Sequence, residues 1–182
     1  MRTPPEKPTI LRPQGEKITL PKPTLIIDSM EQKPYSFRQF CKWFASIERR
    51  KLPVGDYSIA GLENRVAIER KSLQDLFNCS SPNGSREDFV RACERLSKLD
   101  FAALVIEGSI TKILRATEIS NRHPNAVFGT IQALAVRWGI QPWFAPNCAL
   151  AEEIATCLLH KAYQLITLEK RGLPRRFVKG DI

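Results

Sequence analysis

Charged residues gather between Gly55 and Asp75, in a stretch that otherwise has the pattern of sheet and core. Glu69 and Lys71 lie two positions apart in an apolar run typical of a strand. Because side chains alternate along a strand, these two share one face and Arg70 takes the other. In metal-assisted phosphodiester cleavage, a carboxylate holds a divalent cation and a neighbouring lysine orients or polarises the attacking water.

A lone Glu-x-Lys pair is more often a surface salt bridge on an edge strand, since exposed ion pairs are common and contribute little. Here three carboxylates, Asp28, Asp56 and Glu69, fall at predicted strand ends or turns. If they converge in a cleft of low dielectric, their repulsion is severe and a cation relieves it. Oxygen ligands select a hard ion, so Mg²⁺ or Mn²⁺ is the expected cofactor and Zn²⁺ is not.

Arg70 faces away from this predicted site and needs a partner if it is buried. Asp75, about one turn into the helix that follows, is the obvious partner in the sequence. We expect the pair to brace the corner between strand and helix that carries Glu69 and Lys71. Direct contact of Arg70 with a substrate is the less favoured alternative.

Alternating strand and helix patterns extend through the chain from Thr24. The predicted strands are 24–28, 45–52, 57–60, 66–71, 101–107 and 140–144, and the predicted helices are 37–44, 73–77, 85–99, 111–117, 125–138 and 147–171. Ser85 and Asp88 are expected to form a capping box, and Asn147 to cap the last helix. The alternation favours an α/β fold with a central mixed β-sheet flanked by helices.

At 182 residues the chain fits one domain with tails. Residues 1–23 hold six of the 13 prolines and five Lys or Arg, with few large apolar side chains, which predicts a flexible, Pro-rich basic arm. Residues 24–172 form the predicted folded domain. Residues 173–182 form a basic tail that either touches backbone phosphates or frays.

The net charge of +9 lowers the cost of approaching a polyanion. No apolar run is long enough to span a bilayer, and no signal peptide opens the chain. The five cysteines form no Cys-x-x-Cys pair and the two histidines lie far apart, which argues against a zinc site and fits free thiols. We expect a cytoplasmic protein from a prokaryotic or phage-like context, or a nuclear one in a eukaryote.

Gly55-Asp56, followed by Glu69-Arg70-Lys71 and Asp75, resembles the G-D-x(n)-E-R-K-x-x-x-D signature of the XPF/Mus81/Hef family of structure-specific DNA nucleases. The resemblance covers about 24–145 and implies a restriction-endonuclease-like core that cuts flaps, forks and branched junctions with Mg²⁺ or Mn²⁺, usually as a dimer. The roles that it implies are metal ligand for Asp28, Asp56 and Glu69, catalytic lysine for Lys71, and supporting residue for Arg70 and Asp75.

Two departures from the family pattern stand out. Family members commonly carry Asp-x-Arg-Glu after the first strand, where this chain has Asp28-Ser29-Met30-Glu31. A phosphate contact or brace is thus missing, which would slow cleavage or shift the contact to another basic residue. The glycine-rich hairpins of helix-hairpin-helix repeats do not follow the last predicted helix. Branch specificity is then expected to come from the core, a partner or self-association, or to be weaker.

Basic residues on the helix predicted at 85–99 are further candidates for DNA contact: Arg86, Arg91, Arg95 and Lys98. The last three form a stripe opposite the apolar face, for which a solvated face and phosphate contact are equally favoured. Arg86 opposes the helix dipole from the first turn, which hints at a role facing anions. For Glu107, a supporting role in the site is slightly less favoured than an ordinary carboxylate at a strand end.

These observations predict a metal-dependent DNA endonuclease acting on branched or flapped DNA in repair, recombination or replication. The alternative is a catalytically silent nuclease-fold subunit that binds branched DNA or scaffolds an active partner. Silent copies tend to lose the Glu, the Lys or the Asp of Gly-Asp, and here all three are present. A nuclease for RNA or single strands is a third possibility. The long apolar stripe of the last helix predicts a homodimer, or a heterodimer, formed through the last two helices.

Overall fold

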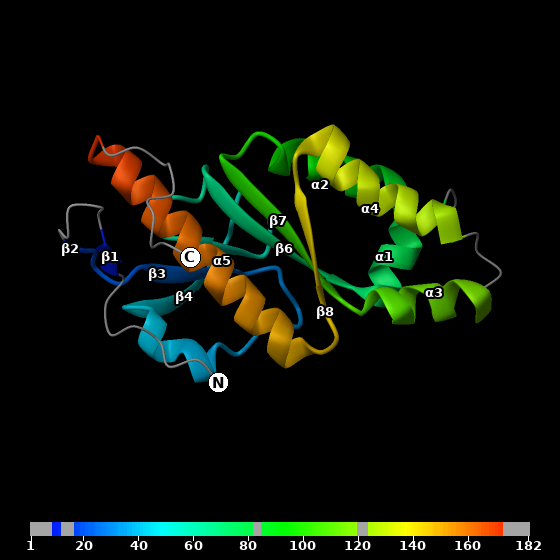
Figure 1. Ribbon diagram of the computed structural model, residues 1–182, viewed down its shortest axis with the longest axis horizontal. Coiled ribbons are helices and arrows are strands. Elements are labelled where there is room, and N and C mark those ends of the chain that lie inside the picture. The colour runs from blue at the N-terminus through cyan, green and yellow to red at the C-terminus, as the bar shows by residue number, and fades with distance from the viewer. Residues whose placement is uncertain (1–8, 12–16, 82–84, 120–123, 173–182) are drawn as a thin grey trace.

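The computed structural model of the protein describes residues 9–11, 17–81, 85–119 and 124–172 (Figure 1). Its centre is a six-stranded mixed sheet in the order β4-β3-β5-β6-β7-β8. The strands of this sheet are β3 (Thr24–Asp28), β4 (Ser46–Arg50), β5 (Tyr57–Ile59), β6 (Val66–Ser72), β7 (Phe101–Glu107) and β8 (Gln141–Ala145). Only β5 runs antiparallel to its neighbours, which are β3 and β6; the other pairs are parallel.

Helices flank the sheet and confirm the predicted α/β fold (Figure 1). They are η1 (Arg38–Trp43), α1 (Leu73–Cys79), α2 (Arg86–Leu96), α3 (Ile110–Ile119), α4 (Pro124–Trp138) and α5 (Cys148–Lys170). The helix predicted at 37–44 is a 3₁₀ turn, η1, rather than an α-helix. Phe37 before it adopts a left-handed backbone, with a φ of 50°.

Side-chain alternation gives the sheet two apolar faces. On one face, Ile68 and Val105 pack with Leu159 of α5. On the other, Leu104 packs with Phe89 of α2 and with apolar side chains of α1 and α4. Consecutive residues of β6 therefore point into different cores, which decides the neighbours of its charged residues. None of the helices in the described segments has the length and apolarity needed to cross a membrane.

Order begins earlier than the sequence predicts. β1 (Thr9–Leu11) pairs antiparallel with β2 (Lys17–Thr19). Leu20 is then buried against Leu168 of α5. This apolar contact ties the chain before β3 to the last helix, so part of the predicted flexible arm, 1–23, is folded.

The two predicted helix caps have different outcomes. The Asn147 side chain accepts the N–H of Leu150 at 2.9 Å, which confirms the start of α5. Ser85 makes no side-chain cap, and Asp88 pairs with Arg91 instead, so the predicted capping box is wrong. Ser85 has a ψ of 34°, outside the extended backbone conformation from which a capping side chain reaches the first turn.

Candidate active site

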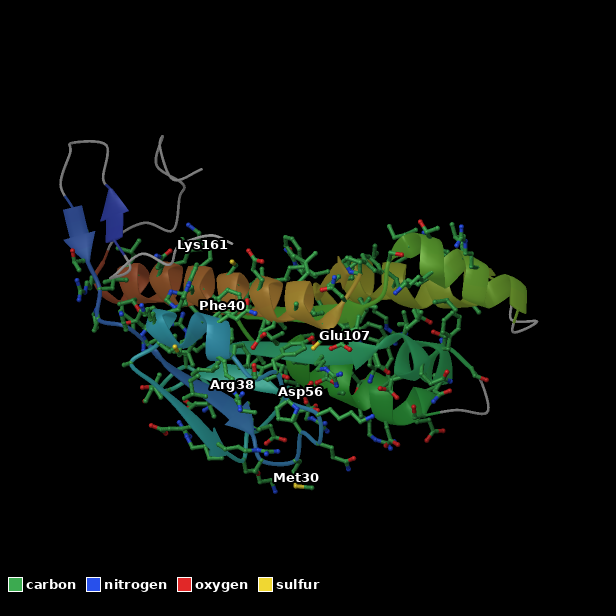
Figure 2. All side chains as sticks on the ribbon, turned by 90° about the horizontal axis from the view of Figure 1, so that it is seen from below. Met30, Arg38, Phe40, Asp56, Glu107 and Lys161 are labelled. Carbon is green, nitrogen blue, oxygen red and sulfur yellow. The ribbon has the colours of Figure 1, made fainter. Side chains whose placement is uncertain are left out.

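Acidic residues from separate strands lie at the same end of the sheet. The strands β3, β6 and β7 run in the same direction, because β5 is antiparallel to both β3 and β6. Asp28 ends β3 and Glu107 ends β7, while Glu69 lies late in β6. Asp56 directly precedes β5 and so reaches the same end, where Figure 2 labels it together with Glu107.

A cavity of about 420 Å³ opens at this end of the sheet. Its lining consists of Met30, Glu31, Gln32, Lys33, Asp56, Glu69, Arg70, Lys71 and Asp75. Every residue predicted as catalytic except Asp28 belongs to this lining. The fold thus brings Asp56 together with the predicted residues of 69–75, and adds the turn 30–33 to the same cavity.

Gly55 lets Asp56 approach β6. Its φ is +76°, and a Cβ there would lie 2.9 Å from the Cβ of Ala67 and 3.2 Å from the carbonyl oxygen of Ile68. The N–H of Asp56 donates to that Ile68 carbonyl at 2.9 Å. The Asp56 carboxylate in turn accepts the backbone N–H of Arg70 at 2.7 Å. Both the conformation and the close approach therefore require glycine.

Asp56, Glu69 and Glu31 form an acidic cluster. Burial raises the pKa of Asp56 to about 8, and repulsion from Glu69 and then from Glu31 adds to the effect. Burial also raises the pKa of Glu69, with the charge of Lys71 opposing it and that of Glu31 reinforcing it. Close to neutral pH the cluster therefore retains a proton, which a bound cation would displace.

The donor set of this cluster fits a hard divalent cation. Within the described segments, no three acidic, His or Cys side chains converge closely enough to hold an ion by themselves. Mg²⁺ does not require such a cage, since one or two carboxylates commonly hold it and water and phosphate oxygens complete its shell. Asp56 and Glu69, both in the cavity lining, supply two such carboxylates, and Glu31 supplies a third nearby.

Glu69 and Lys71 lie on the same face of β6, as the alternation predicts. The Lys71 Nζ is 3.9 Å from the Glu69 Oε1, and only 18% and 19% of the two side chains are exposed. The ammonium also lies 5.3 Å from the ring centre of Phe89. With so little exposure, this pair is not the solvated surface salt bridge that a lone Glu-x-Lys would indicate.

Arg70 points to the other face of β6, where its partner is Glu107. The guanidinium donates to both carboxylate oxygens, from Nε at 2.7 Å and from a terminal nitrogen at 3.0 Å. It lies 5.6 Å from the ring centre of Tyr35 and 3.6 Å from a carboxylate oxygen of Glu31. The Arg70 and Glu107 side chains are only 14% and 16% exposed. Their ion pair links β6 to β7 on the face of the sheet opposite Glu69 and Lys71.

The predicted pairing of Arg70 with Asp75 is therefore wrong. Asp75 belongs to α1, which covers the opposite face of the sheet. The Ser72 hydroxyl donates to the Asp75 carboxylate at 2.6 Å. The backbone N–H of Asp75 in turn donates to the hydroxyl oxygen of Ser72 at 3.1 Å. Ser72 and Asp75 thus fix the start of α1 directly after Lys71, and the Asp75 side chain is exposed at the cavity.

Asp28 is not among the residues that line the cavity, although its negative charge contributes to the raised pKa of Glu69. One carboxylate oxygen accepts the N–H of Leu52 at 2.8 Å and the other accepts that of Met30 at 3.2 Å. Its role as a metal ligand stays a prediction. Glu31, which does line the cavity, was not assigned to the site from the sequence. Its signal was present in Asp28-Ser29-Met30-Glu31, whose last carboxylate matches the Asp-x-Arg-Glu pattern.

The basic residues of α2 differ in their surroundings. Arg91 pairs with Glu87 and Asp88 of its own helix on the surface. The positive charge of Arg95 acts on Glu69, where it partly offsets the raised pKa. Contact of Arg86, Arg91, Arg95 and Lys98 with DNA stays a prediction. The basic tail, 173–182, lies outside the described residues.

Comparison with known proteins places this geometry in a family. Residues 27–156 match the family model of the ERCC4 domain. No curated protein matches the chain in sequence. A solved structure of XPF from Aeropyrum pernix aligns with a TM-score of 0.54 at 19% identity, over 80% of this chain and 62% of that one. A structure of XPF from Aeropyrum pernix in complex with DNA aligns with a TM-score of 0.54 at 20% identity, over 85% and 77% of the two chains.

The chain therefore spans less than two thirds of the first of these XPF structures. At such identity the likeness shows the fold, and it confirms the restriction-endonuclease-like core. The family-model match covers more than half of the chain and contains the whole Gly-Asp to Glu-Arg-Lys motif. This protein thus belongs to the ERCC4 domain family, the XPF-type DNA nucleases that its motif resembles.

Proposed function

We propose that this protein is an endonuclease that hydrolyses phosphodiester bonds of branched or flapped DNA with the help of Mg²⁺ or Mn²⁺. The observation that carries the proposal is the acidic cluster in the cavity, with Lys71 beside it. Asp56 and Glu69 line this cavity with Glu31 nearby, and burial together with repulsion from Glu69 and Glu31 raises the pKa of Asp56 to about 8. Such an arrangement costs stability and is typical of a site that binds a cation.

Each side chain in the cavity has a distinct role in this proposal. Asp56 and Glu69, with Glu31, would hold the cation, which when bound activates water and polarises the phosphate. Lys71 orients the attacking water, and its charge stabilises the negative charge that grows on the phosphate oxygens. Glu107 holds Arg70 in place, and the Arg70 backbone N–H orients the Asp56 carboxylate.

DNA is the proposed substrate for two reasons. The net charge of +9 favours a polyanion, and the XPF structure that covers most of this chain was solved with DNA. Preference for branches follows from the resemblance to structure-specific nucleases. Repair, recombination and replication are the processes that generate such branches.

The direct test is cleavage of labelled flap, fork, four-way junction and linear DNA by the purified protein. We expect cleavage with Mg²⁺ or Mn²⁺, none in excess EDTA, and faster cutting of branched than of linear DNA. Glu69→Gln should abolish cleavage while DNA affinity is largely kept, and Glu94→Gln, on the exposed side of α2, is the matched control. DNA binding without cleavage by the wild type would favour the silent-subunit function. Full activity in EDTA, or in Glu69→Gln, would refute the proposed site.

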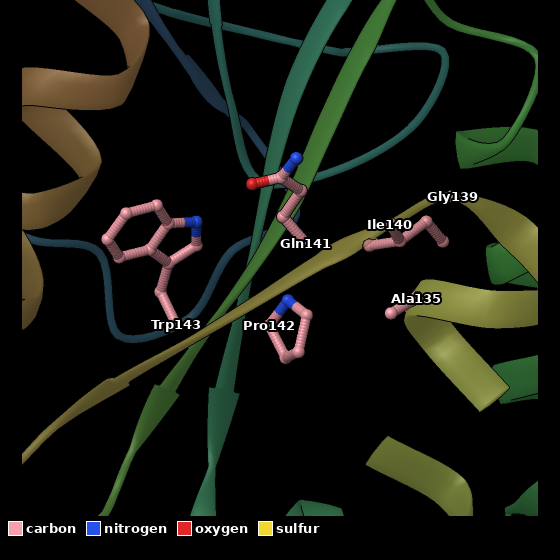
Figure 3. Close-up of a pocket in the computed structure, with 6 residues that line it drawn as sticks. All are labelled: Ala135, Gly139, Ile140, Gln141, Pro142 and Trp143. Carbon is pink, nitrogen blue, oxygen red and sulfur yellow. The ribbon is translucent and has the colours of Figure 1, made fainter. Parts of the chain in front are cut away.

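We further propose that the protein forms a homodimer, or pairs with a partner, through the surface at α4, β8 and the start of α5. Val136 is 89% exposed on α4, and Trp143 of β8 and Leu150 of α5 are also exposed apolar side chains. A cavity of about 490 Å³ at the end of α4 and the start of β8 (Figure 3) is lined by Ala135, Gly139, Ile140, Gln141, Pro142 and Trp143. Large apolar side chains exposed in this way are candidates for burial in an interface.

The edge strand β8 contains Pro142, which has no N–H to donate to an added strand. Contact through side chains is therefore expected rather than extension of the sheet. Light scattering should report a dimer for the wild type, and Val136→Asp should shift it toward the monomer of 20.7 kDa. A wild-type monomer at high protein concentration would refute the homodimer and leave pairing with another protein.

A further inference from the structure

The cavity lining has more acidic than basic side chains, and some of the basic side chains are already paired with carboxylates. Its acidic members are Glu31, Asp56, Glu69 and Asp75, and its basic members are Lys33, Arg70 and Lys71. Arg70 is held by Glu107, and the Lys71 ammonium lies close to Glu69. Lys33, in contrast, takes part in none of the ion pairs between described residues.

The turn that carries Lys33 is held in place by several hydrogen bonds. The Lys33 backbone N–H donates to the Glu31 carboxylate at 2.6 Å, and the Glu31 N–H donates to the Asp28 carbonyl at 3.3 Å. From β4, the Arg49 guanidinium donates to the backbone carbonyls of Ser29 and Glu31. The side chain of Lys33 therefore projects from an anchored backbone at the cavity wall.

No other residue of this turn supplies a positive charge to the cavity. Met30 is 73% exposed and cannot bind a phosphate, and Gln32 is uncharged. Elsewhere around the cavity, Lys71 of β6 and Arg95 of α2 act on Glu69. Lys33, on the turn after β3, adds a cation from a separate segment, so that a bound nucleic-acid strand would meet positive charge on more than one side.

We propose that Lys33 binds a backbone phosphate of the DNA strand that occupies the cavity. This inference rests on the function proposed above, because it takes DNA as the ligand of the cavity. An ammonium on a flexible stem neutralises one phosphate as a point charge and needs no bidentate geometry. Lys33 is thus a substrate-binding residue. It supplies a positive charge to the turn on which Met30 replaces the arginine of the family pattern.

The test measures binding apart from cleavage, in a protein that already carries Glu69→Gln. DNA affinity is determined by fluorescence anisotropy with a labelled fork over a range of salt concentrations, with Mg²⁺ present. Adding Lys33→Ala should weaken binding by about tenfold at low salt and reduce the slope of log affinity against log salt by about one. Lys33→Arg should keep both values, and Lys161→Ala on α5, far from Met30 in Figure 2, is the matched control.

A rescue variant separates a lost phosphate contact from a disturbed turn. Met30→Arg, added to Lys33→Ala, restores a cation at the same turn and should recover most of the affinity and of the salt slope. If Lys33→Ala binds as tightly as Lys161→Ala and with the same slope, the role of Lys33 is refuted while the proposed nuclease function stands. If the Glu69→Gln protein with Lys33 intact does not bind DNA, the proposed function itself fails.

Discussion

Asp56→Asn replaces the titratable carboxyl group of Asp56 by a neutral amide and keeps an oxygen that can accept the Arg70 N–H, which Asp56 accepts at 2.7 Å. In the wild type, burial and the repulsion from Glu69 and Glu31 raise the pKa of Asp56 from 3.8 to about 8. Between these two pKa values, Asp56 therefore keeps its proton in the folded protein and has already released it in the unfolded chain. The variant has no such proton to hold.

The sign of the pH dependence follows from this difference. Because the pKa of Asp56 is higher in the folded state, proton binding by Asp56 stabilises the folded protein at low pH. This stabilisation is lost as the pH rises toward about 8. For one retained proton, the free energy of unfolding falls by at most about 1.4 kcal/mol for each pH unit in this window. Rearrangement of the cluster and entry of water reduce that slope, so we expect about 1 kcal/mol per pH unit.

Urea denaturation between about pH 5 and about pH 8, in EDTA and followed by tryptophan fluorescence, measures this slope. The free energy of unfolding is plotted against pH for both proteins. Subtracting the wild-type values from those of Asp56→Asn removes the titration of the groups that the two proteins share. The difference should grow in favour of the variant as pH rises. Glu94→Gln, exposed on α2, should run parallel to the wild type. At about pH 8, Mg²⁺ should stabilise the wild type more than Asp56→Asn.

Parallel wild-type and Asp56→Asn curves over the whole range would refute the reasoning. Such a result would mean that Asp56 is ionised in the folded protein at every pH tested and that the cluster retains no proton. An equal stabilisation of the two proteins by Mg²⁺ would remove Asp56 from the proposed cation site, even if the pH dependence were as expected.

Three further predictions concern residues around the cluster. Glu107→Gln should lower the free energy of unfolding by about 3 kcal/mol, because the half-buried Arg70 guanidinium loses its bidentate partner and is left with the longer 3.6 Å contact to Glu31. Asp75→Asn should cost under about 1 kcal/mol, and equal losses in urea denaturation would contradict the pairing of Arg70 with Glu107. Gly55→Ala should lower the melting temperature more than Gly61→Ala, since the φ angles are +76° and +77° but only Gly55 lacks room for a Cβ; matching melting curves would argue against the close approach. Lys71→Gln should slow single-turnover cleavage at saturating DNA by at least about tenfold with little change in affinity; an unchanged rate would remove Lys71 from the chemistry.

Local rules of the chain were enough to predict the fold class and the shared face of Glu69 and Lys71 on β6. A strand has a period of two, which follows from backbone geometry, so Glu69 and Lys71 had to share a face whatever lay beside them. The alternation of strand and helix patterns likewise predicted the α/β sheet. Gly55 before Asp56 marked a turn in the sequence, and the structure shows why no larger residue fits there.

Partners from distant segments could be assigned only from the tertiary structure. Asp75 is nearer to Arg70 in sequence than Glu107, yet β7 lies beside β6 with Glu107 opposite Ser72, so the more distant carboxylate becomes the partner. The same applies to Glu31, which a turn after β3 brings to the cavity, whereas the Asp28 carboxylate accepts the backbone N–H of Leu52 and does not line the cavity. Side-chain periodicity is set within a few residues of backbone, whereas ion pairs depend on which strands are neighbours and in what register, and long-range packing alone determines that.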